Sequence, residues 1–420
     1  MSAQWTERGI AMTGQTDKEA LDCLLRGKAP AQSAVLKQIT TGLDSLTDFL
    51  HRHYLSNYIP EGGSKIKFVT GRSGSGKTHL AQCLLAESSA MGFLTVAVSA
   101  KEVWLHDFRE VYLEILRQCD IERVLSGCAG QIMREMGCDP SALKEGQTFL
   151  DYLVEKGEGD AISRGEIRSA LRRLFTRNPL LDNGFASCCS LLTGGILGHP
   201  VLEPASRELL LAYLNGDKTI KLSQLRLLGF TPSRITKYNA RYLLRSLTEV
   251  VHLAGYAGLM VVVDDLDVLV ERSAGSAIRY TKLRREDTYE SIRQLIDDID
   301  NMRHVMFLFC FDRVLMDDEN YGVKSYQALW LRIQNEVVSR RFNRFADMID
   351  LDRYADEAYD AQTLRRMSER LAETLRNAGI SAAPIDDATA QELAARAEFG
   401  GMGLPYLVNR EVVGGGSANV

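Results

Sequence analysis

The feature that most constrains the fold of this chain is a glycine-rich octapeptide that follows a short apolar stretch. It matches the pattern GxxxxGK[ST] and consists of Gly71, Arg72, Ser73, Gly74, Ser75, Gly76, Lys77 and Thr78. Residues 66–70 before it predict a strand, and residues 78–91 after it predict a helix. Glycines allow the unusual φ angles of a tight loop, whose N–H groups can surround a phosphate at the helix N-terminus. The segment therefore predicts a strand–loop–helix unit that binds phosphate groups.

Two side chains at the end of this loop suit a nucleoside triphosphate with its metal ion. Lys77 can reach the β- and γ-phosphates, and the Thr78 hydroxyl can ligate magnesium. We therefore expect the loop to bind ATP and Mg²⁺. The alternative is a glycine-rich turn without a ligand.

A second strand is predicted to end in two carboxylates. The apolar residues 259–263 precede Asp264 and Asp265. Asp264 would hold the magnesium ion, directly or through water. Asp265 stands where many ATPases carry a glutamate that orients the attacking water, so it is the candidate catalytic acid, with Asp267 as a second candidate. The alternative is a buried strand that ends in an acidic turn.

A third apolar strand, residues 305–311, is expected to lie between the other two. Asp312 follows it and would either face the γ-phosphate or cap the next helix. At the end of a later predicted helix, Arg340 and Arg341, with Arg344 close by, could reach the active site of a neighbouring subunit. The alternative is a solvated helix C-terminus, which also favours cations.

Two basic segments could contact nucleic acid. Residues 271–287 hold five lysines and arginines, with Tyr280 and Tyr289 in or near them. Residues 222–244 have the spacing of a helix–turn–helix, although ordinary helical packing explains the pattern better. A solvated or partner-facing loop is the alternative for the first segment.

The order of predicted elements indicates the fold class. Strands are expected at 66–70, 94–98, 259–265, 304–312 and 345–351, with helices between them, as in a parallel sheet covered on both faces. We predict an α/β fold, namely a P-loop NTPase (ASCE, AAA+-like) with a parallel sheet core, a large helical insertion and a C-terminal helical lid. The predicted parts are an N-terminal helical segment 1–62, a discontinuous core 63–118 and 246–352, the insertion 119–245, and the lid with its tail 353–420.

Composition favours a cytoplasmic protein. Apolar runs are too short to span a membrane, and the N-terminal residues lack the pattern of a secretion signal. The eight cysteines are scattered without metal-ligand spacing, so buried free thiols are expected. Because the net charge is −5, the surface as a whole should not attract nucleic acid, and only local basic segments could contact it.

Several stretches resemble the BREX-system ATP-binding domain family. They are ALDCLLRGKAPAQSAV, FVTGRSGSGKTHLAQCLL, HDFREVYLEIL, AYLNGDKTIKLSQLRLLG and GYAGLMVVVDDLDVL, and their order and spacing match over nearly the whole chain. The resemblance implies a P-loop ATPase of bacterial anti-phage defence clusters, in a DNA-associated complex with helicase-like or methyltransferase components. Lys77, Thr78 and Asp264 match the family's nucleotide-binding residues.

The chain departs from the family pattern at two places. Asp265 stands where the family commonly has Glu, and Tyr406 stands where a basic residue often follows the proline of the lid. Arg410 would be a poor substitute for that basic residue. The strings VVVDDLD and FLFCFDR also resemble the KAP family of P-loop NTPases, which carries membrane segments that have no counterpart here.

Three functions follow from these patterns. The first is an ATP-hydrolysing motor or switch in a phage-defence complex, coupled to DNA and oligomeric. The second is a nucleotide-gated scaffold with little intrinsic ATPase activity, which the short Asp265 favours. The third is a small-molecule kinase, which the long helical insertion and the acid pair disfavour.

Overall fold

A computed structural model of the chain describes residues 15–31, 33–271, 278–337, 342–396 and 401–415. Within these residues, five parallel strands form one sheet in the order β2-β3-β4-β1-β5. They are β1 (Ser64–Gly71), β2 (Leu94–Ser99), β3 (Leu259–Asp264), β4 (Val305–Asp312) and β5 (Met348–Asp350). The predicted α/β fold with a parallel sheet is confirmed, and β4 lies between β1 and β3 as expected.

The central strands β3 and β4 are buried on both faces, which explains why they are apolar runs rather than alternating patterns. In β4, Met306 and Leu308 belong to one buried apolar cluster, and Phe307 and Phe309 belong to the other. Because successive side chains of a strand point to opposite faces, β1, β3, β4 and β5 contribute to two separate cores, whereas the edge strand β2 contributes to one.

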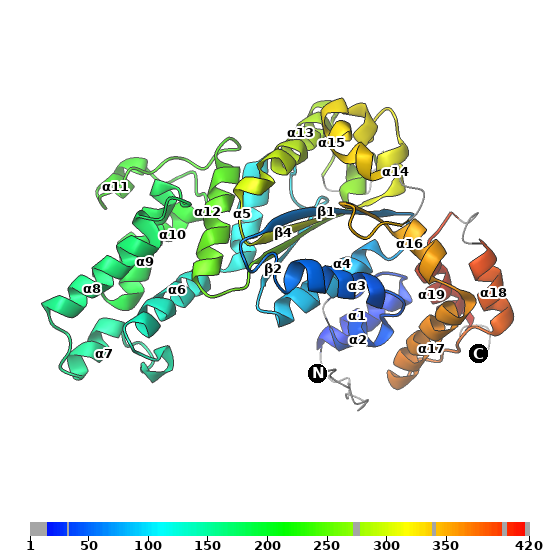
Figure 1. Cartoon of the computed structure of the whole chain (residues 1–420), viewed down its shortest axis with the longest axis horizontal. Helices are drawn as coiled ribbons and strands as arrows, with labels where there is room; N and C mark the ends of the chain where they lie inside the picture. The colour runs from blue at the N-terminus through cyan, green and yellow to red at the C-terminus, as the bar shows by residue number, and fades with distance from the viewer. Residues whose placement is uncertain (1–14, 32, 272–277, 338–341, 397–400, 416–420) are drawn as a thin grey trace.

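Helices from both ends of the chain cover the first face (Figure 1). They are α1 (Gln15–Leu25), α2 (Ala34–Ile39), α3 (Asp44–Leu50), α4 (Lys77–Ala90), α16 (Leu351–Ala358), α17 (Ala361–Asn377), α18 (Asp387–Arg396) and α19 (Leu404–Gly415). Arg370 of α17 donates a hydrogen bond of 2.7 Å to the carbonyl of Thr40, just after α2. The N-terminal helices therefore pack directly against the C-terminal ones.

The middle of the chain forms one continuous apolar cluster with the side chains on the second face of the sheet. Its helices are α5 (Phe108–Cys119), α6 (Ile121–Glu135), α7 (Phe149–Glu155), α8 (Ala161–Leu171), α9 (Asn183–Leu197), α10 (Pro204–Leu214), α11 (Leu222–Arg226), α12 (Ala240–Leu253), α13 (Lys282–Asp298), α14 (Arg313–Asp317) and α15 (Gln327–Val337). Figure 1 shows α6 to α11 at the end of the molecule opposite α17 to α19. The stretch 100–258, which is described throughout, contains no strand. The domain limits themselves remain predictions.

Other expectations can be compared with the structure. All eight cysteines are free, and six of them are buried. Among the described helices, none has the length and the apolar character that a membrane crossing requires. Arg340 and Arg341 lie outside the described residues.

Candidate functional site

A cleft of about 730 Å³ lies beside the glycine-rich loop 71–78, between three parts of the chain. Its floor comes from the glycine-rich loop and from the residues that follow β3 and β4. Its walls come from the N-terminal helices on one side and from α17 and α19 on the other. Polar side chains that follow parallel strands meet at the same edge of a sheet, which is where ligands bind in open α/β folds.

The glycine-rich loop is held by the start of α19. The N–H of Gly403 donates to the carbonyl of Ser73 at 2.8 Å, and the N–H of Tyr406 donates to the carbonyl of Gly74 at 3.2 Å. Gly74 has a φ of +77°, and a Cβ built on it would lie 2.4 Å from the Cβ of Tyr406. Glycine is thus required at Gly74 both by the backbone angle and by the close approach of the C-terminal helix.

Lys77 lies at the base of the cleft and is buried. Its ammonium donates to the carbonyls of Gly71 at 3.0 Å and Arg72 at 2.9 Å, and it lies 3.5 Å from a carboxylate oxygen of Asp312. A positive charge is therefore positioned where the loop would surround a phosphate.

Thr78 and Asp264 meet although 186 positions separate them in the sequence. The Thr78 hydroxyl donates to Oδ2 of Asp264 at 2.8 Å, and Oδ1 of Asp264 accepts the N–H of Asp265 at 2.8 Å. Burial raises the pKa of Asp264 above its usual range. A hydroxyl and one carboxylate suit Mg²⁺, which retains several waters and takes its other ligands from phosphates. The described residues contain no group of three or more His, Cys, Asp or Glu arranged for a metal.

Asp265 is held by two residues that the sequence analysis did not identify. Its carboxylate accepts hydrogen bonds of 2.7 Å from the hydroxyl of Ser99 and 2.7 Å from the ammonium of Lys101. Burial opposes the charge of Lys101, but the hydrogen bond and the charge of Asp265 raise the pKa of Lys101. Asp265 has a φ of +62°, an uncommon backbone angle for this residue type. The parallel pairing of β2 with β3 brings these residues together, and no local sequence pattern predicts this contact.

Asp267 and Asp312 form a second acidic contact in the cleft. Oδ1 of Asp267 accepts the N–H of Asp312, and Oδ1 of Asp312 accepts the N–H of Val314 at 3.3 Å. Asp312 therefore caps α14, as one alternative predicted, and lies near Lys77. Its role toward a γ-phosphate stays a prediction. Burial raises the pKa of Asp267 to about 6, so neutralising this group should stabilise the fold.

We expect Asp267→Asn to raise the free energy of unfolding by about 2–3 kcal/mol at pH 8, because the ordinary pKa of 3.8 is raised to about 6. The amide oxygen of Asn can still accept the N–H of Asp312. Because burial raises its pKa, ionised Asp267 lowers the free energy of unfolding by the full amount above about pH 6, and by progressively less as the pH falls toward 3.8. Urea unfolding in EDTA at pH 8 and pH 5 should show the gain shrinking at pH 5. A gain that does not change with pH would contradict this origin.

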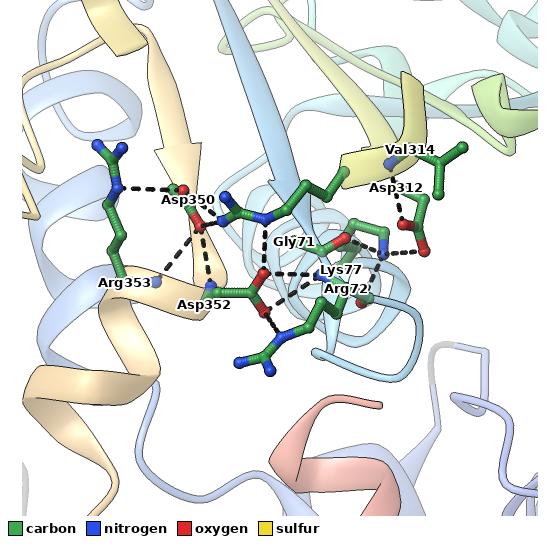
Figure 2. A network of polar contacts seen from close by, with 9 residues as sticks. Gly71, Arg72, Lys77, Asp312, Val314, Asp350, Asp352 and Arg353 are labelled. Carbon is green, nitrogen blue, oxygen red and sulfur yellow. Dashed lines mark hydrogen bonds and ion pairs between the residues drawn. The ribbon is translucent and has the colours of Figure 1, made fainter. Parts of the chain in front are cut away.

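A network of ion pairs joins the glycine-rich loop to the segment after β5 (Figure 2). Both carboxylate oxygens of Asp352 accept the backbone N–H of Arg72, at 3.1 and 3.0 Å. The guanidinium of Arg313 donates to Asp350 at 2.7 Å and to Asp352 at 3.0 Å. The backbone N–H of Arg72 thus points to Asp352 and not into the cleft. The predicted loop residues that do line the cleft are Ser73, Gly74, Gly76, Lys77 and Thr78.

One part of the cleft is lined by apolar side chains. Leu24, Pro30 and Ile39 line it from the N-terminal side, and Met367 and Leu371 line it from α17. His79 lies at the boundary between the apolar and polar parts, and its Nε2 is 2.9 Å from the Thr40 hydroxyl. Burial lowers the pKa of His79 to about 4, so this ring is neutral at physiological pH. The sequence analysis did not identify the apolar residues because they come from segments near opposite ends of the chain.

Several other candidates lie away from the cleft. Arg410 is exposed and does not line it. Arg344 lies over the ring of Phe49, 5.9 Å from its centre. Tyr280 and Tyr289 are buried and donate hydrogen bonds to backbone carbonyls, so the proposed nucleic-acid contacts through these two rings are wrong. The helix–turn–helix interpretation is also wrong, because the five residues of α11 and the thirteen residues that separate α11 from α12 do not form that motif.

A family model described as BREX system ATP-binding protein BrxC/D matches residues 13–136 and 168–413. Both matched stretches together contain every residue that lines the cleft. No curated protein and no solved structure matches the chain.

Proposed function

The chain belongs to the family of BREX system ATP-binding proteins BrxC/D, and from this premise we propose that it binds MgATP in the cleft and hydrolyses it. The observation that carries the proposal is the contact between Thr78 and Asp264, with Lys77 beside them. In this assignment residues 71–78 are the Walker A loop, and β3 with Asp264 and Asp265 is the Walker B strand. The position of β4 between β1 and β3 supports the P-loop NTPase fold with an added strand and catalytic acid.

Each group in the cleft would have one task in hydrolysis. The ammonium of Lys77 neutralises charge on the β- and γ-phosphates, and Thr78 and Asp264 hold the magnesium. Bound Mg²⁺ withdraws charge from the phosphate oxygens. Asp265 orients the attacking water once its carboxylate turns away from Lys101, and Asp312 faces the γ-phosphate from β4.

The apolar part of the cleft would take the adenine ring. Leu24 and Pro30 would contact one side of the ring, and Met367 and Leu371 the other. Because the two walls come from opposite ends of the chain, bound ATP would link the N-terminal helices to the C-terminal lid. This arrangement provides a way for the nucleotide state to change the orientation of the lid.

The wider role follows from the family. We propose that the ATP cycle serves phage defence in the bacterial cytoplasm, coupled to DNA and to helicase-like or methyltransferase components. In a homo-oligomer, Arg340 and Arg341 would act on the site of the neighbouring subunit.

A second candidate is a nucleotide-gated scaffold that turns over little ATP by itself. The observation that favours it is the pair of hydrogen bonds from Ser99 and Lys101 to Asp265, which keeps the candidate catalytic acid occupied. Partner binding would then have to release Asp265 before hydrolysis.

The deciding experiment is ATP turnover by the purified protein with and without double-stranded DNA, with Lys77→Ala as the control. Turnover that rises with DNA and disappears in the control supports the DNA-coupled ATPase. ATP binding without turnover in either condition supports the scaffold. Absence of ATP binding contradicts both.

We expect Lys101→Ala to raise basal turnover by about threefold to tenfold, because one of the two restraints on Asp265 is lost. The matched control is Lys28→Ala, which removes the same charge from another residue of the cleft. Steady-state turnover at saturating ATP measures the effect. A fall in turnover in Lys101→Ala alone would mean that Lys101 assists the reaction instead of restraining it.

A further inference from the structure

One segment of the chain is strongly basic. The 31 residues from Lys218 to Thr248 contain seven lysines and arginines and no Asp or Glu, in a chain whose net charge is −5. This segment includes α11, the connection that follows it and most of α12. Figure 1 shows α11 on the side of the molecule remote from the lid and α12 beside α5, next to the sheet. A concentration of one charge on an acidic protein favours a partner of the opposite charge.

Five of the seven cations of this segment lie at the surface, whereas Arg241 and Arg245 are half-buried. Lys218, Lys221, Arg226, Arg234 and Lys237 are exposed. No ion pair among the described residues involves Lys221, Arg226 or Lys237. Their charges are therefore available to a ligand.

The backbone that carries these cations is fixed by two arginines. Arg234 donates to the carbonyls of Lys218 at 3.2 Å and Ile220 at 3.4 Å, and Arg109 donates to those of Gly216 at 2.7 Å and Ile235 at 3.2 Å. A hollow of about 480 Å³ lies between these stretches, with Lys218, Arg234 and Lys237 at its edge. The hollow also contains the carboxylates of Asp107 and Asp217. The Asp217 carboxylate already accepts the N–H and hydroxyl of Thr219.

A second basic stretch lies next to this segment. Arg284, at the start of α13, is exposed and lies over the ring of Trp104, 4.3 Å from its centre. Burial and then the charge of Arg284 lower the pKa of His106, and Lys237 acts in the same direction. The carboxylates of Asp107 and Asp287 act on His106 in the opposite direction. Asp107, the residue after His106, lines the same hollow as Lys237, so the two stretches are neighbours.

We propose that this basic surface, consisting of Lys218, Lys221, Arg226, Arg234, Lys237 and Arg284, binds the phosphate backbone of double-stranded DNA without reading its sequence. Spaced exposed cations on a rigid support match a regular array of phosphates. A single-stranded partner would require aromatic faces for base stacking. The face of Trp104 carries Arg284, and Lys237 lies 5.4 Å from the ring centre of Tyr238. Tyr238 and Tyr242 are exposed, so binding of a single strand is the competing outcome that the test includes. The proposal deepens the proposed coupling to DNA and gives it a location.

The test compares two triple variants of the full chain. Lys221→Ala/Arg226→Ala/Lys237→Ala removes three exposed cations of the basic surface. The control Lys18→Ala/Lys37→Ala/Arg376→Ala removes three exposed cations from α1, α2 and α17. Binding of a fluorescent duplex of about 30 base pairs is followed without nucleotide, from about 50 to 200 mM salt.

We expect the first variant to lose at least about tenfold in affinity at low salt, and the slope of log K against log salt to fall by about 2–3. The control should bind within about twofold of the wild type, and a single strand of equal length should bind more weakly than the duplex. Equal losses in both variants, or an unchanged slope, would overturn the proposal. Tighter binding of the single strand would overturn the duplex assignment.

Failure of this proposal can be separated from failure of the proposed ATPase. Basal ATP turnover without DNA should be unchanged in both triple variants, because neither removes a residue that lines the nucleotide cleft. If the protein hydrolyses ATP but the wild type and both triple variants bind duplex equally well, the proposed ATPase stands and the proposed DNA-binding surface is wrong. If the first triple variant loses duplex binding but the wild type never hydrolyses ATP, the DNA-binding surface stands and the proposed ATPase is wrong.

Discussion

Lys77→Ala is expected to reduce ATP turnover at least about a thousandfold, because one preorganised donor at a site of developing charge accounts for about 10²–10³ and Lys77 also carries a full charge. Its ammonium already lies in position, with the carbonyls of Gly71 and Arg72 and the carboxylate of Asp312 around it. No neighbouring cation replaces it in the described part of the cleft floor, since Lys101 is paired with Asp265. Turnover at saturating MgATP measures the loss.

The matched control for this experiment is Lys65→Ala. Lys65 lies on β1, the strand that leads into the same loop, but its ammonium pairs with Asp347 at 2.5 Å, away from the cleft. Both variants should show the circular dichroism spectrum of the wild type. If Lys77→Ala retains more than about a tenth of the wild-type rate, the phosphate-binding role of the loop is wrong.

Asp265→Asn is expected to lower turnover by about 10²–10³-fold while ATP affinity changes by less than about threefold. The amide keeps the size of the side chain, but it cannot act as the anionic acceptor that orients water. The contact between Thr78 and Asp264, which would hold magnesium, does not involve the Asp265 side chain. Turnover and equilibrium binding of a fluorescent ATP analogue separate the two effects.

Asp267→Asn provides the comparison for that experiment. Asp267 lies in the same cleft, and burial raises its pKa to about 6, whereas Asp265 is paired with Lys101. If Asp265→Asn hydrolyses ATP normally and Asp267→Asn does not, then Asp267 is the catalytic acid. If both retain full activity, water activation depends on another residue, and Glu271 and Asp312 are the other carboxylates of the cleft past Asp267.

The sequence by itself determined the parts of this protein whose signals are local. The glycine-rich loop is recognisable because its φ angles and close contacts demand glycine at particular positions, such as Gly74. The strands β3 and β4 are recognisable because parallel strands that are buried on both faces are continuous apolar runs. Asp264 and Asp265 are recognisable because a carboxylate after such a run must lie at the sheet edge. From these features the α/β fold and the candidate acids could be predicted.

Only the tertiary structure decided which of these parts meet. The pairing of β2 with β3 brings Lys101 to Asp265, and packing of the two chain ends brings α19 onto the glycine-rich loop. Tyr280, predicted to be available for nucleic acid, is buried instead. Such contacts depend on strand order and on helix packing between distant segments, and neither leaves a periodic pattern in the sequence. The motif therefore identifies the floor of the cleft, while the fold supplies its walls and the restraint on its candidate catalytic acid.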